Sequence, residues 1–391
     1  MSSNFDREQL GKPYKKLYDA MLEWFSTDLT AESDVREFDI KGVEANGEDV
    51  SEVISAVLND HPGIVCLGHS KSDYGYLIPP PWINEEGHLV ISMQDRVCGM
   101  SFAYTAEERK KKTEEVEKWK RSVLERVKGN TDIEKIVSLT GIFATDFTYL
   151  RAAPSFDIAG VVSKRIVCEA FGRAFKVICD ELGIWCIMVF GHAGSPSTPK
   201  KKWDAHCWNI VRIDNKYYHV DSTWANTTSL TDPAGLLGNG RKVFSYGFML
   251  MDDKDISNSH TMLPDSYPKC NDGKLEYYRS KGWIRRFSRN FDECLTGPEE
   301  MRKMIRKMHG AHGDVYVLRC RLLDEDGKIP TRQKARDLIG RLTAYTIPNA
   351  LGLNQGSYRH HGFDDTSGNY IMVFNTRATM RRKGNERIDA V

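Results

Sequence analysis

Residues 166–183 read IVCEAFGRAFKVICDELG, and this stretch decides the fold of the region around it. Its apolar side chains recur every three or four positions, which is typical of an amphipathic helix: Val167, Phe171, Ala174, Ile178 and Leu182. Gly183 supplies a residue that readily adopts the left-handed conformation at a helix end. We therefore expect a helix of about four turns that packs into a core.

Cys168 lies in the first turn of this expected helix. A thiol at that position lies near the positive end of the helix dipole, which favours the nucleophilic thiolate form. Cys179 lies beside Ile178 in the same helix, and Cys186 lies in the apolar segment that follows. We expect both of these cysteines to be buried and inert.

The segments after the helix predict antiparallel strands. Residues 184–190 (IWCIMVF) form an apolar run of strand length, and a Gly-, Ser-, Pro- and Lys-rich loop is expected over 191–202. The runs 206–213 (HCWNIVRI) and 216–221 (KYYHVD) are separated only by Asp214-Asn215. A two-residue connection of this kind between strand-like runs predicts a β-hairpin.

The register of this hairpin places two polar side chains on one face. If residue 213 pairs with 216, Asp221 lies opposite Trp208, and His206 is two residues further along the same face. Asp221 can then bind one nitrogen of the His206 imidazole and leave the other nitrogen for a thiol. A shift of one residue would place the two side chains on opposite faces. His219 lies nearer the turn, and we expect it to be exposed or at the edge of the core.

Cys168, His206 and Asp221 therefore have the chemistry of a nucleophile, a base and an orienting carboxylate. A long chain contains many Cys, His and Asp residues in this order, so the triple alone leaves coincidence open. The expected hairpin register and the helix-start position of the cysteine are two further observations that favour a functional set.

A family resemblance supports the same residues. The segments concerned are 167–175 (VCEAFGRAF), 182–184 (LGI), 206–211 (HCWNIV) and 217–224 (YYHVDSTW), followed by 248–253 (FMLMDD) and His260-Thr261. Together they resemble the bacterial transglutaminase-like superfamily. The resemblance covers about 155–265, is weaker over 1–150 and is absent after 280.

This resemblance implies Cys168 as nucleophile, His206 as base and Asp221 as orienter. It also implies an α+β fold with a papain-like transglutaminase core, in which the catalytic helix packs on an antiparallel sheet. Ile166, Ala170-Phe171 and Cys207 depart from the residues that are usual in the family, which leaves substrate preference open. The backbone N–H of Cys168 is one candidate oxyanion donor, and the second donor is not assigned.

The rest of the chain predicts accessory regions on both sides of this core. We expect an N-terminal region of helices and short strands over 1–128, the catalytic core over 129–275 and a C-terminal α+β module over 276–391. Helical spacing is expected at 10–25, 50–58, 105–128, 297–309 and 332–344, and Asp132 is expected to cap a further helix. Strands are expected at 314–320 and 370–374, with a turn at 324–327.

Composition limits the class of protein. The 391 residues include 40% apolar and 28% charged residues, with a formal net charge of +1. This balance argues against nucleic acid or a membrane as partner. The sequence shows no secretory signal and no membrane-spanning run, and its nine cysteines contain no C-x-x-C, so we expect a cytoplasmic protein. A signal removed earlier would leave the same sequence.

No cofactor or metal is expected. His309 and His312 lie at an expected helix end, and His360-His361 in an expected loop. None of these histidines has a neighbouring carboxylate at a spacing typical of a metal site.

The expected reaction is acyl transfer from a protein or peptide amide through a thioester on Cys168, completed by water or by an amine. Trp203 and Trp224 are expected to line the substrate cleft, and residues 191–205 to act as a lid. One alternative is a glycan amidase, which the absence of paired C-x-x-C zinc motifs disfavours. A second is a non-catalytic protein-binding scaffold that retains the core. The oligomeric state is left open.

Overall fold

The computed structural model of the chain describes most of the first two-thirds of the sequence and parts of the remainder. The described residues are 4–27, 35–39, 43, 45–65, 81–92, 105–150, 157–194, 198–227, 230–231, 242–243, 248–263, 267–271, 294–295, 315–322, 328, 330–341, 359–363 and 369–375.

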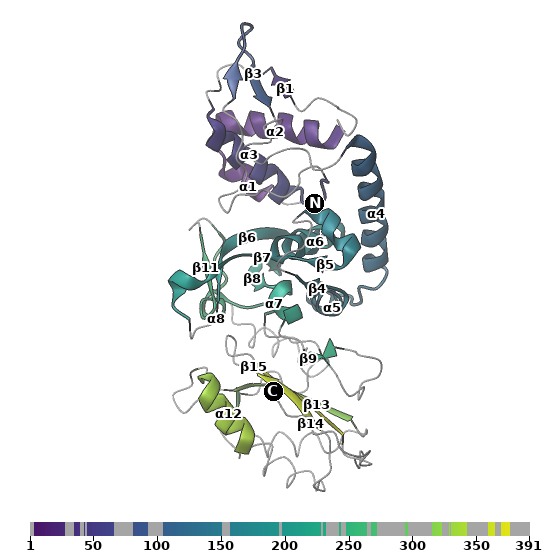
Figure 1. Cartoon of the computed structure of the whole chain (residues 1–391), viewed down its shortest axis with the longest axis vertical. Coiled ribbons are helices and arrows are strands. Elements are labelled where there is room, and N and C mark those ends of the chain that lie inside the picture. The colour runs from purple at the N-terminus through teal and green to yellow at the C-terminus, as the bar shows by residue number, and fades with distance from the viewer. Residues whose placement is uncertain are drawn as a thin grey trace.

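The N-terminal region packs helices against a small sheet, at one end of the molecule (Figure 1). Its helices are α1 (Phe5–Gln9), α2 (Lys12–Thr27) and α3 (Gly47–Asp60). The strands β1 (Val35–Phe38), β2 (Trp82–Ile83) and β3 (Leu89–Ser92) form an antiparallel sheet in the order β1-β3-β2. Apolar side chains of α2, α3 and β3 form one buried cluster, which confirms the two helices expected from spacing here.

Two longer helices follow, and each begins with a capping box. They are α4 (Ala106–Leu124), capped by Thr105, and α5 (Asp132–Asp146), capped by Thr131. The expectation that Asp132 caps α5 is wrong. The Thr131 hydroxyl accepts the Glu134 N–H at 3.3 Å, so Thr131 is the N-cap and Asp132 is the first helical residue.

In the cysteine-bearing helix α6 (Cys168–Glu181), every residue from 170 to 179 is buried. The helix follows a short parallel pair, β4 (Thr148–Tyr149) with β5 (Arg165–Ile166), and a 3-10 helix η1 (Ile158–Ser163). Even two charged side chains of α6 are buried. The Arg173 Nη1 donates to the Leu58 carbonyl of α3 at 2.7 Å, and the Lys176 Nζ lies 2.9 Å from Asp180 Oδ2. The N-terminal region therefore covers the polar face of α6.

The central sheet has four antiparallel strands in the order β11-β6-β7-β8. They are β6 (Cys186–Ala193), β7 (Asp204–Ile213), β8 (Lys216–Val220) and β11 (His260–Met262). The strand expected at 184–190 thus begins later and runs on to 193. Gly191–Ala193 pair with both β7 and β11, so the loop expected from 191 is shorter, and it contains the 3-10 helix η2 (Lys200–Lys202).

The hairpin between β7 and β8 has the expected register. Ile213 pairs with Lys216, and the ladder continues to Asn209 opposite Val220, so Asp221 follows in the position expected for the partner of Trp208. Asp214 and Asn215 both have positive φ angles, 50° and 62°. This conformation is that of the tight turn which matches the twist of paired strands, and it fixes the register.

Helix α6 lies against one face of this sheet through a close approach. A methyl group at position 172 would lie only 3.0 Å from the Cys207 sulfur, closer than ordinary van der Waals contact, so the glycine favours the close approach. The buried Asn209 amide then donates to the carbonyls of Gly172 on α6 and Ile187 on β6, at 3.0 and 3.2 Å. The side chain of Asn209 therefore ties the helix to the sheet.

The other face of the sheet carries Trp208 and is covered by later segments. Ile187, Val189, Trp208 and Ile210 form a buried cluster with Tyr267 and Cys270. The short helix α8 (Asp253–Ile256) adds to this covering, since Asp253 Oδ1 lies 2.9 Å from Nε2 of His219 on β8. The other short helix, α7 (Ser222–Thr227), directly follows β8 and packs against α5 and α6. The two faces of the sheet thus have different coverings.

The C-terminal part contains another four-stranded sheet in the order β12-β13-β15-β14, at the end of the molecule opposite the N-terminal region (Figure 1). Its strands are β12 (Cys294–Leu295), β13 (Val315–Leu322), β14 (Arg359–Phe363) and β15 (Asn369–Asn375), accompanied by α12 (Arg332–Arg341). A small pair, β9 (Leu230–Thr231) with β10 (Lys242–Val243), precedes it. His360-His361 belong to β14, so the expected loop there is wrong.

The helix expected at 297–309, with His309 and His312, and the turn expected at 324–327 lie outside the described residues. Among the helices that the structure describes, none combines the length and apolarity needed to cross a membrane.

Asn226 gives a test of how α7 stabilises this fold. Its buried Nδ2 lies 3.2, 2.9 and 2.7 Å from the carbonyl oxygens of Phe143, Ala144 and Phe147, at the end of α5. Asn226→Leu leaves buried carbonyls without a donor and is expected to lower the free energy of unfolding by about 2–3 kcal/mol. Urea denaturation measures this, with Asn258→Leu as the control.

Asn258 makes the same type of contact, to the Asp255 carbonyl at 3.1 Å, but in an exposed position. Because water replaces the lost bond there, we expect a change within about 0.5 kcal/mol. Equal losses in the two variants would contradict the role given to Asn226.

Candidate active site

Cys168 is the first residue of α6, as the sequence predicts. Its N-cap is Val167, whose extended backbone (φ −95°, ψ 174°) starts the helix and whose side chain cannot accept a hydrogen bond. Cys168 is partly exposed, whereas Cys179, Cys186, Cys207 and Cys270 are buried. Among the cysteines whose burial the structure describes, Cys168 is thus the accessible one.

His206 lies on β7 between this thiol and a carboxylate. Its Nε2 is 2.7 Å from Asp221 Oδ2, and its side chain also forms a hydrogen bond with Cys168. Because Nε2 is taken by Asp221, Nδ1 is the nitrogen left for the sulfur. The structure therefore brings together the three residues that the sequence singles out, in the order thiol, imidazole, carboxylate.

Asp221 directly follows β8 and is fully buried. Its Oδ1 accepts the backbone N–H of Trp224 at 2.9 Å, where α7 begins. Its Oδ2 lies near two imidazoles, since His260 Nε2 is 3.0 Å from the same oxygen that His206 contacts. The carboxylate is thus held at both oxygens.

The electrostatics of His206 and Asp221 favour the charged form of each. Burial lowers the pKa of His206, but the Asp221 carboxylate and then the Cys168 sulfur outweigh it and raise the pKa to about 10. Burial raises the pKa of Asp221, but hydrogen bonds and charge from His206 and His260 bring it well below its usual range. At neutral pH the pair is therefore imidazolium and carboxylate.

His260 is a residue that the sequence did not single out as part of the site. It is the first residue of β11 and is buried, with its Nδ1 2.8 Å from the Ser259 Oγ. Burial, opposed by Asp221, lowers the pKa of His260 to about 4, so this imidazole is neutral at neutral pH. In the sequence, His260 is marked only by the short motif His260-Thr261. Two residues show no periodicity from which a strand or its partner could be predicted.

A second imidazole–carboxylate pair lies next to the site. Trp208 stacks on His206, with ring centroids 5.9 Å apart, and its Nε1–H donates to His219 Nδ1 at 3.0 Å. His219 Nε2 in turn is 2.9 Å from Asp253 Oδ1. His219 is fully buried, so the expectation of an exposed or edge position is wrong. The burial arises because α8 and the segment before it cover the face of the sheet that carries His219.

This arrangement fits a metal ion poorly. His219, Asp253 and Cys270 bring ligand atoms close together, but the Trp208 N–H occupies the lone pair of His219 Nδ1. A neutral His219 must then carry its proton on Nε2, the nitrogen that would have to bind the metal. The hydrogen bond between His219 and Asp253 accounts for the proximity of these two side chains without a metal ion.

Two other described groups have metal-ligand residue types. His206, Asp221 and His260 direct both imidazole Nε2 atoms to one carboxylate oxygen at hydrogen-bond distances. Glu37, Glu86 and His88 lie on the surface of the N-terminal sheet, where ion pairs between them account for their proximity.

The structure places the two tryptophans differently. Trp224 is partly buried, and its ring centroid is 6.2 Å from that of His206. Trp203 packs on the backbone of Gly194, where a methyl group would lie 2.3 Å from the indole, and its Nε1–H donates to the Thr198 carbonyl at 3.0 Å. Trp224 is thus beside the triad, while substrate contact by either residue stays a prediction.

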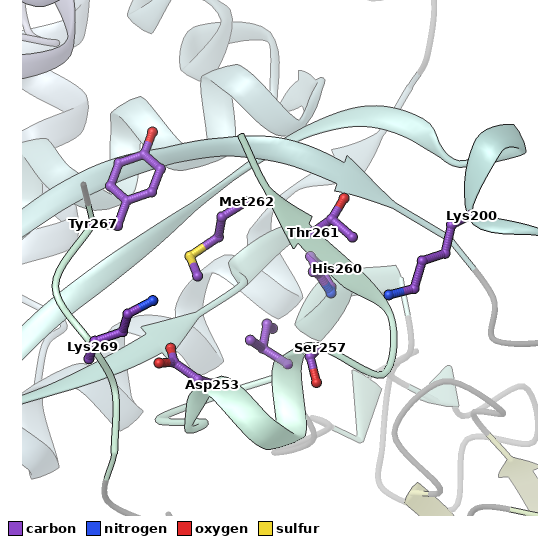
Figure 2. Close-up of a pocket in the computed structure, with 9 residues that line it drawn as sticks. Lys200, Asp253, Ser257, His260, Thr261, Met262, Tyr267 and Lys269 are labelled. Atoms are coloured by element: carbon purple, nitrogen blue, oxygen red, sulfur yellow. The ribbon is translucent and has the colours of Figure 1, made fainter. Parts of the chain in front are cut away.

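A pocket of about 230 Å³ is lined in part by His260 (Figure 2). Its lining includes Lys200 from η2, Asp253 from α8, and Lys269. Figure 2 shows the ammonium groups of both lysines directed into the pocket from opposite sides, with His260 between them.

A thiol at the start of a helix, facing an imidazole on an antiparallel sheet, defines a papain-like α+β arrangement, and comparison with known proteins agrees. The family model described as the transglutaminase-like superfamily core matches residues 118–222. The chain therefore carries a transglutaminase-like domain over this stretch, and the expected family and fold class are confirmed. No curated protein matches the chain.

Solved structures with similarity include a TGase (18% identity, 31% of this chain and 34% of that chain, TM-score 0.25). A candidate cysteine protease from Cytophaga hutchinsonii is 17% identical (33% and 42% coverage, TM-score 0.24). The periplasmic domain of TgpA from Pseudomonas aeruginosa, bound to ethylmercury, is also 17% identical (28% and 43% coverage, TM-score 0.22). The chain thus spans less than half the length of each of these three structures.

The expected domain boundaries and cytoplasmic location stay predictions.

The raised pKa of His206 predicts a pH-dependent contribution to stability. Its pKa is about 6.5 in the unfolded chain and about 10 in the folded protein. The stabilisation is therefore complete below pH 6.5 and is lost as the pH rises through about 10. We expect the difference in free energy of unfolding between the wild type and His206→Gln to shrink from pH 7 to pH 10.

Denaturant unfolding at several pH values measures this difference. Cys168→Ser serves as the matched background, because it removes one of the two groups that raise the pKa of His206. In the Cys168→Ser background, the free-energy difference between His206 and His206→Gln should begin to shrink at a lower pH than it does with Cys168 present. A difference that stays constant from pH 7 to pH 10 in both backgrounds would contradict the assignment of an imidazolium.

Proposed function

We propose that the chain is a cysteine-dependent acyltransferase that acts on amide substrates through a thioester on Cys168. The observation that carries this proposal is the hydrogen-bonded series of Cys168, His206 and Asp221 at the N-terminal end of α6. The transglutaminase-like domain at 118–222 supports it, because that superfamily is often cysteine-dependent.

The first half of the reaction forms the thioester. The Cys168 thiolate attacks the amide carbonyl carbon, and the carbonyl π electrons move to the oxygen of a tetrahedral intermediate. The backbone N–H of Cys168 is a candidate donor to this oxyanion. The intermediate collapses as the C–N bond breaks, and the His206 imidazolium gives its proton to the departing amine.

The second half releases the acyl group. Neutral His206 takes a proton from water or from a primary amine, which then attacks the thioester carbonyl. The C–S bond breaks and the electron pair returns to Cys168 as thiolate. Asp221 keeps Nδ1 of His206 directed at the sulfur throughout, since it holds Nε2 at 2.7 Å.

The proposed substrate is a protein or peptide amide of the glutamine type. Trp224 supports this choice, because a partly buried indole near His206 offers an apolar wall for a substrate side chain. Lys200–Lys202 are exposed beside Trp203 and would suit an acidic sequence near the amide. The near-zero net charge argues against nucleic acid and membrane surfaces as partners.

A protein-binding scaffold without activity is the second candidate. Some members of the superfamily are non-catalytic, and the shared domain is compatible with that role. The retention of all three residues in hydrogen-bonded contact favours the enzyme.

Selective alkylation of Cys168 separates the two candidates. We expect iodoacetamide at pH 7 to modify Cys168 before the other cysteines, because Cys168 is partly exposed and hydrogen-bonded to His206, while burial raises the pKa of the Cys179 and Cys207 thiols. Peptide mapping by mass spectrometry reads the order. His206→Gln should slow the reaction at Cys168 by at least about tenfold. Uniform labelling of the cysteines would favour the scaffold.

Product analysis tests the acyl transfer itself. A library of glutamine-containing peptides is incubated with the protein, with and without a primary amine, and read by mass. We expect deamidated or amine-linked products that Cys168→Ala abolishes. Asp221→Asn keeps the size of the side chain but not its charge and should slow product formation by about a hundredfold or more. Absence of both products from the wild type would count against the enzyme.

A further inference from the structure

Asp221 shares a single oxygen between two imidazoles. Oδ2 is 2.7 Å from His206 Nε2 and 3.0 Å from His260 Nε2, while Oδ1 is occupied by the Trp224 N–H. The two imidazole ring centroids are 5.4 Å apart. The second imidazole is thus within the same hydrogen-bonded group as the proposed base, although it does not touch the thiol.

The positions of the protons follow from this arrangement. Asp221 is ionised, so its Oδ2 only accepts, and both Nε2 atoms must donate. His260 is neutral and has one ring proton, so its Nδ1 accepts the hydroxyl proton of Ser259 at 2.8 Å. Ser259 therefore fixes the tautomer of His260 that points an N–H at Asp221.

The His260 ring is also fixed in place by its neighbours. Its centroid lies 5.0 Å from that of Trp208, 4.9 Å from Trp224 and 6.0 Å from Phe248. Its backbone is held in the sheet, where His260 pairs with Ala193 of β6. The hydrogen bond to Asp221 is therefore a fixed feature of the site, built by a strand far along the chain.

The other charged and titratable groups around His260 come from several elements. Among the described residues they include His206 on β7, Asp221 after β8, His219 on β8, Asp253 on α8, Lys200 in η2, Tyr267 and Lys269. Asp221 is the acidic partner in hydrogen-bond contact with His260, whereas Asp253 is bonded to His219. A substitution of His260 therefore alters the hydrogen bonding of Asp221 directly.

We propose that His260 is a positioning residue which, by sharing Oδ2 of Asp221, divides the charge of that carboxylate and limits its hold on the His206 imidazolium. This inference rests on the function proposed above. His206 must first hold a proton beside the thiolate and then release it to the leaving amine. A carboxylate directed at His206 alone would favour the first state at the expense of the second.

The test is the pH dependence of Cys168 alkylation by iodoacetamide in the full chain. The wild type is compared with His260→Leu, which removes the donor, and His260→Gln, whose side-chain amide places an N–H at the position of Nε2. In His260→Leu the undivided carboxylate stabilises the imidazolium more, so the pH at which the thiolate appears should fall by about half a unit to one unit. His260→Gln should restore the wild-type profile.

Thr261→Val is the matched control on the same strand. Thr261 pairs with His192, and the alternation of a strand directs its side chain to the opposite face from His260. This variant should keep the wild-type pH profile. Thermal unfolding of each variant shows whether a change in profile accompanies a loss of structure.

Imidazole rescue provides a second measurement, should leucine prevent folding. His260→Ala leaves a space beside the pocket of about 230 Å³, through which free imidazole can reach Asp221. We expect the profile of His260→Ala to lie at lower pH and to return toward that of the wild type as imidazole is added. The wild type with imidazole is the control.

The outcomes distinguish this inference from the proposed function. A wild-type Cys168 that reacts like an ordinary thiol overturns the proposed function. A reactive wild-type Cys168 whose profile is unchanged in His260→Leu overturns the role of His260 alone. A shift of His260→Leu to higher pH also overturns it, because His260 would then only hold Asp221 in place.

Discussion

The buried carboxylate of Asp221 is the group on which the rest of the site depends. A buried charge is costly unless it is paired and hydrogen-bonded, and this one receives two imidazole N–H groups and one backbone N–H. These donors come from β7, β11 and the start of α7, so three segments converge on one side chain. The pairing of the strands and the position of α7 are thus linked to the ionisation of a single residue.

The thiol end of the site depends on a different set of contacts. Gly172 allows the sheet to approach α6 closely, and Asn209 bonds to the carbonyls on both sides of that contact. Asn209 lies on β7 only three residues from His206. The strand that carries the imidazole is therefore the strand that holds the helix of Cys168, which couples the position of the sulfur to that of the ring.

Local sequence was enough to predict the parts of the site that are set by short-range rules. The register that aligns His206 with Asp221 follows from a two-residue turn, and both of its residues adopt the positive φ angles that such a turn needs. The helix of Cys168 follows from its apolar spacing. His260 escaped prediction because its strand has three residues and pairs with β6 across a long stretch of chain. The burial of His219 was missed for a related reason, since a distant segment covers it.

The burial of residues 170–179 in α6 depends on contacts from outside the stretch that matches the superfamily. The stretch that matches the superfamily, 118–222, includes Arg173 and Lys176, yet the Arg173 guanidinium binds the Leu58 carbonyl, which lies outside that stretch. A fragment cut at the borders of the match would lose the Leu58 carbonyl that accepts from Arg173, and part of the packing that buries its central helix. The N-terminal region therefore helps to bury the helix that carries Cys168.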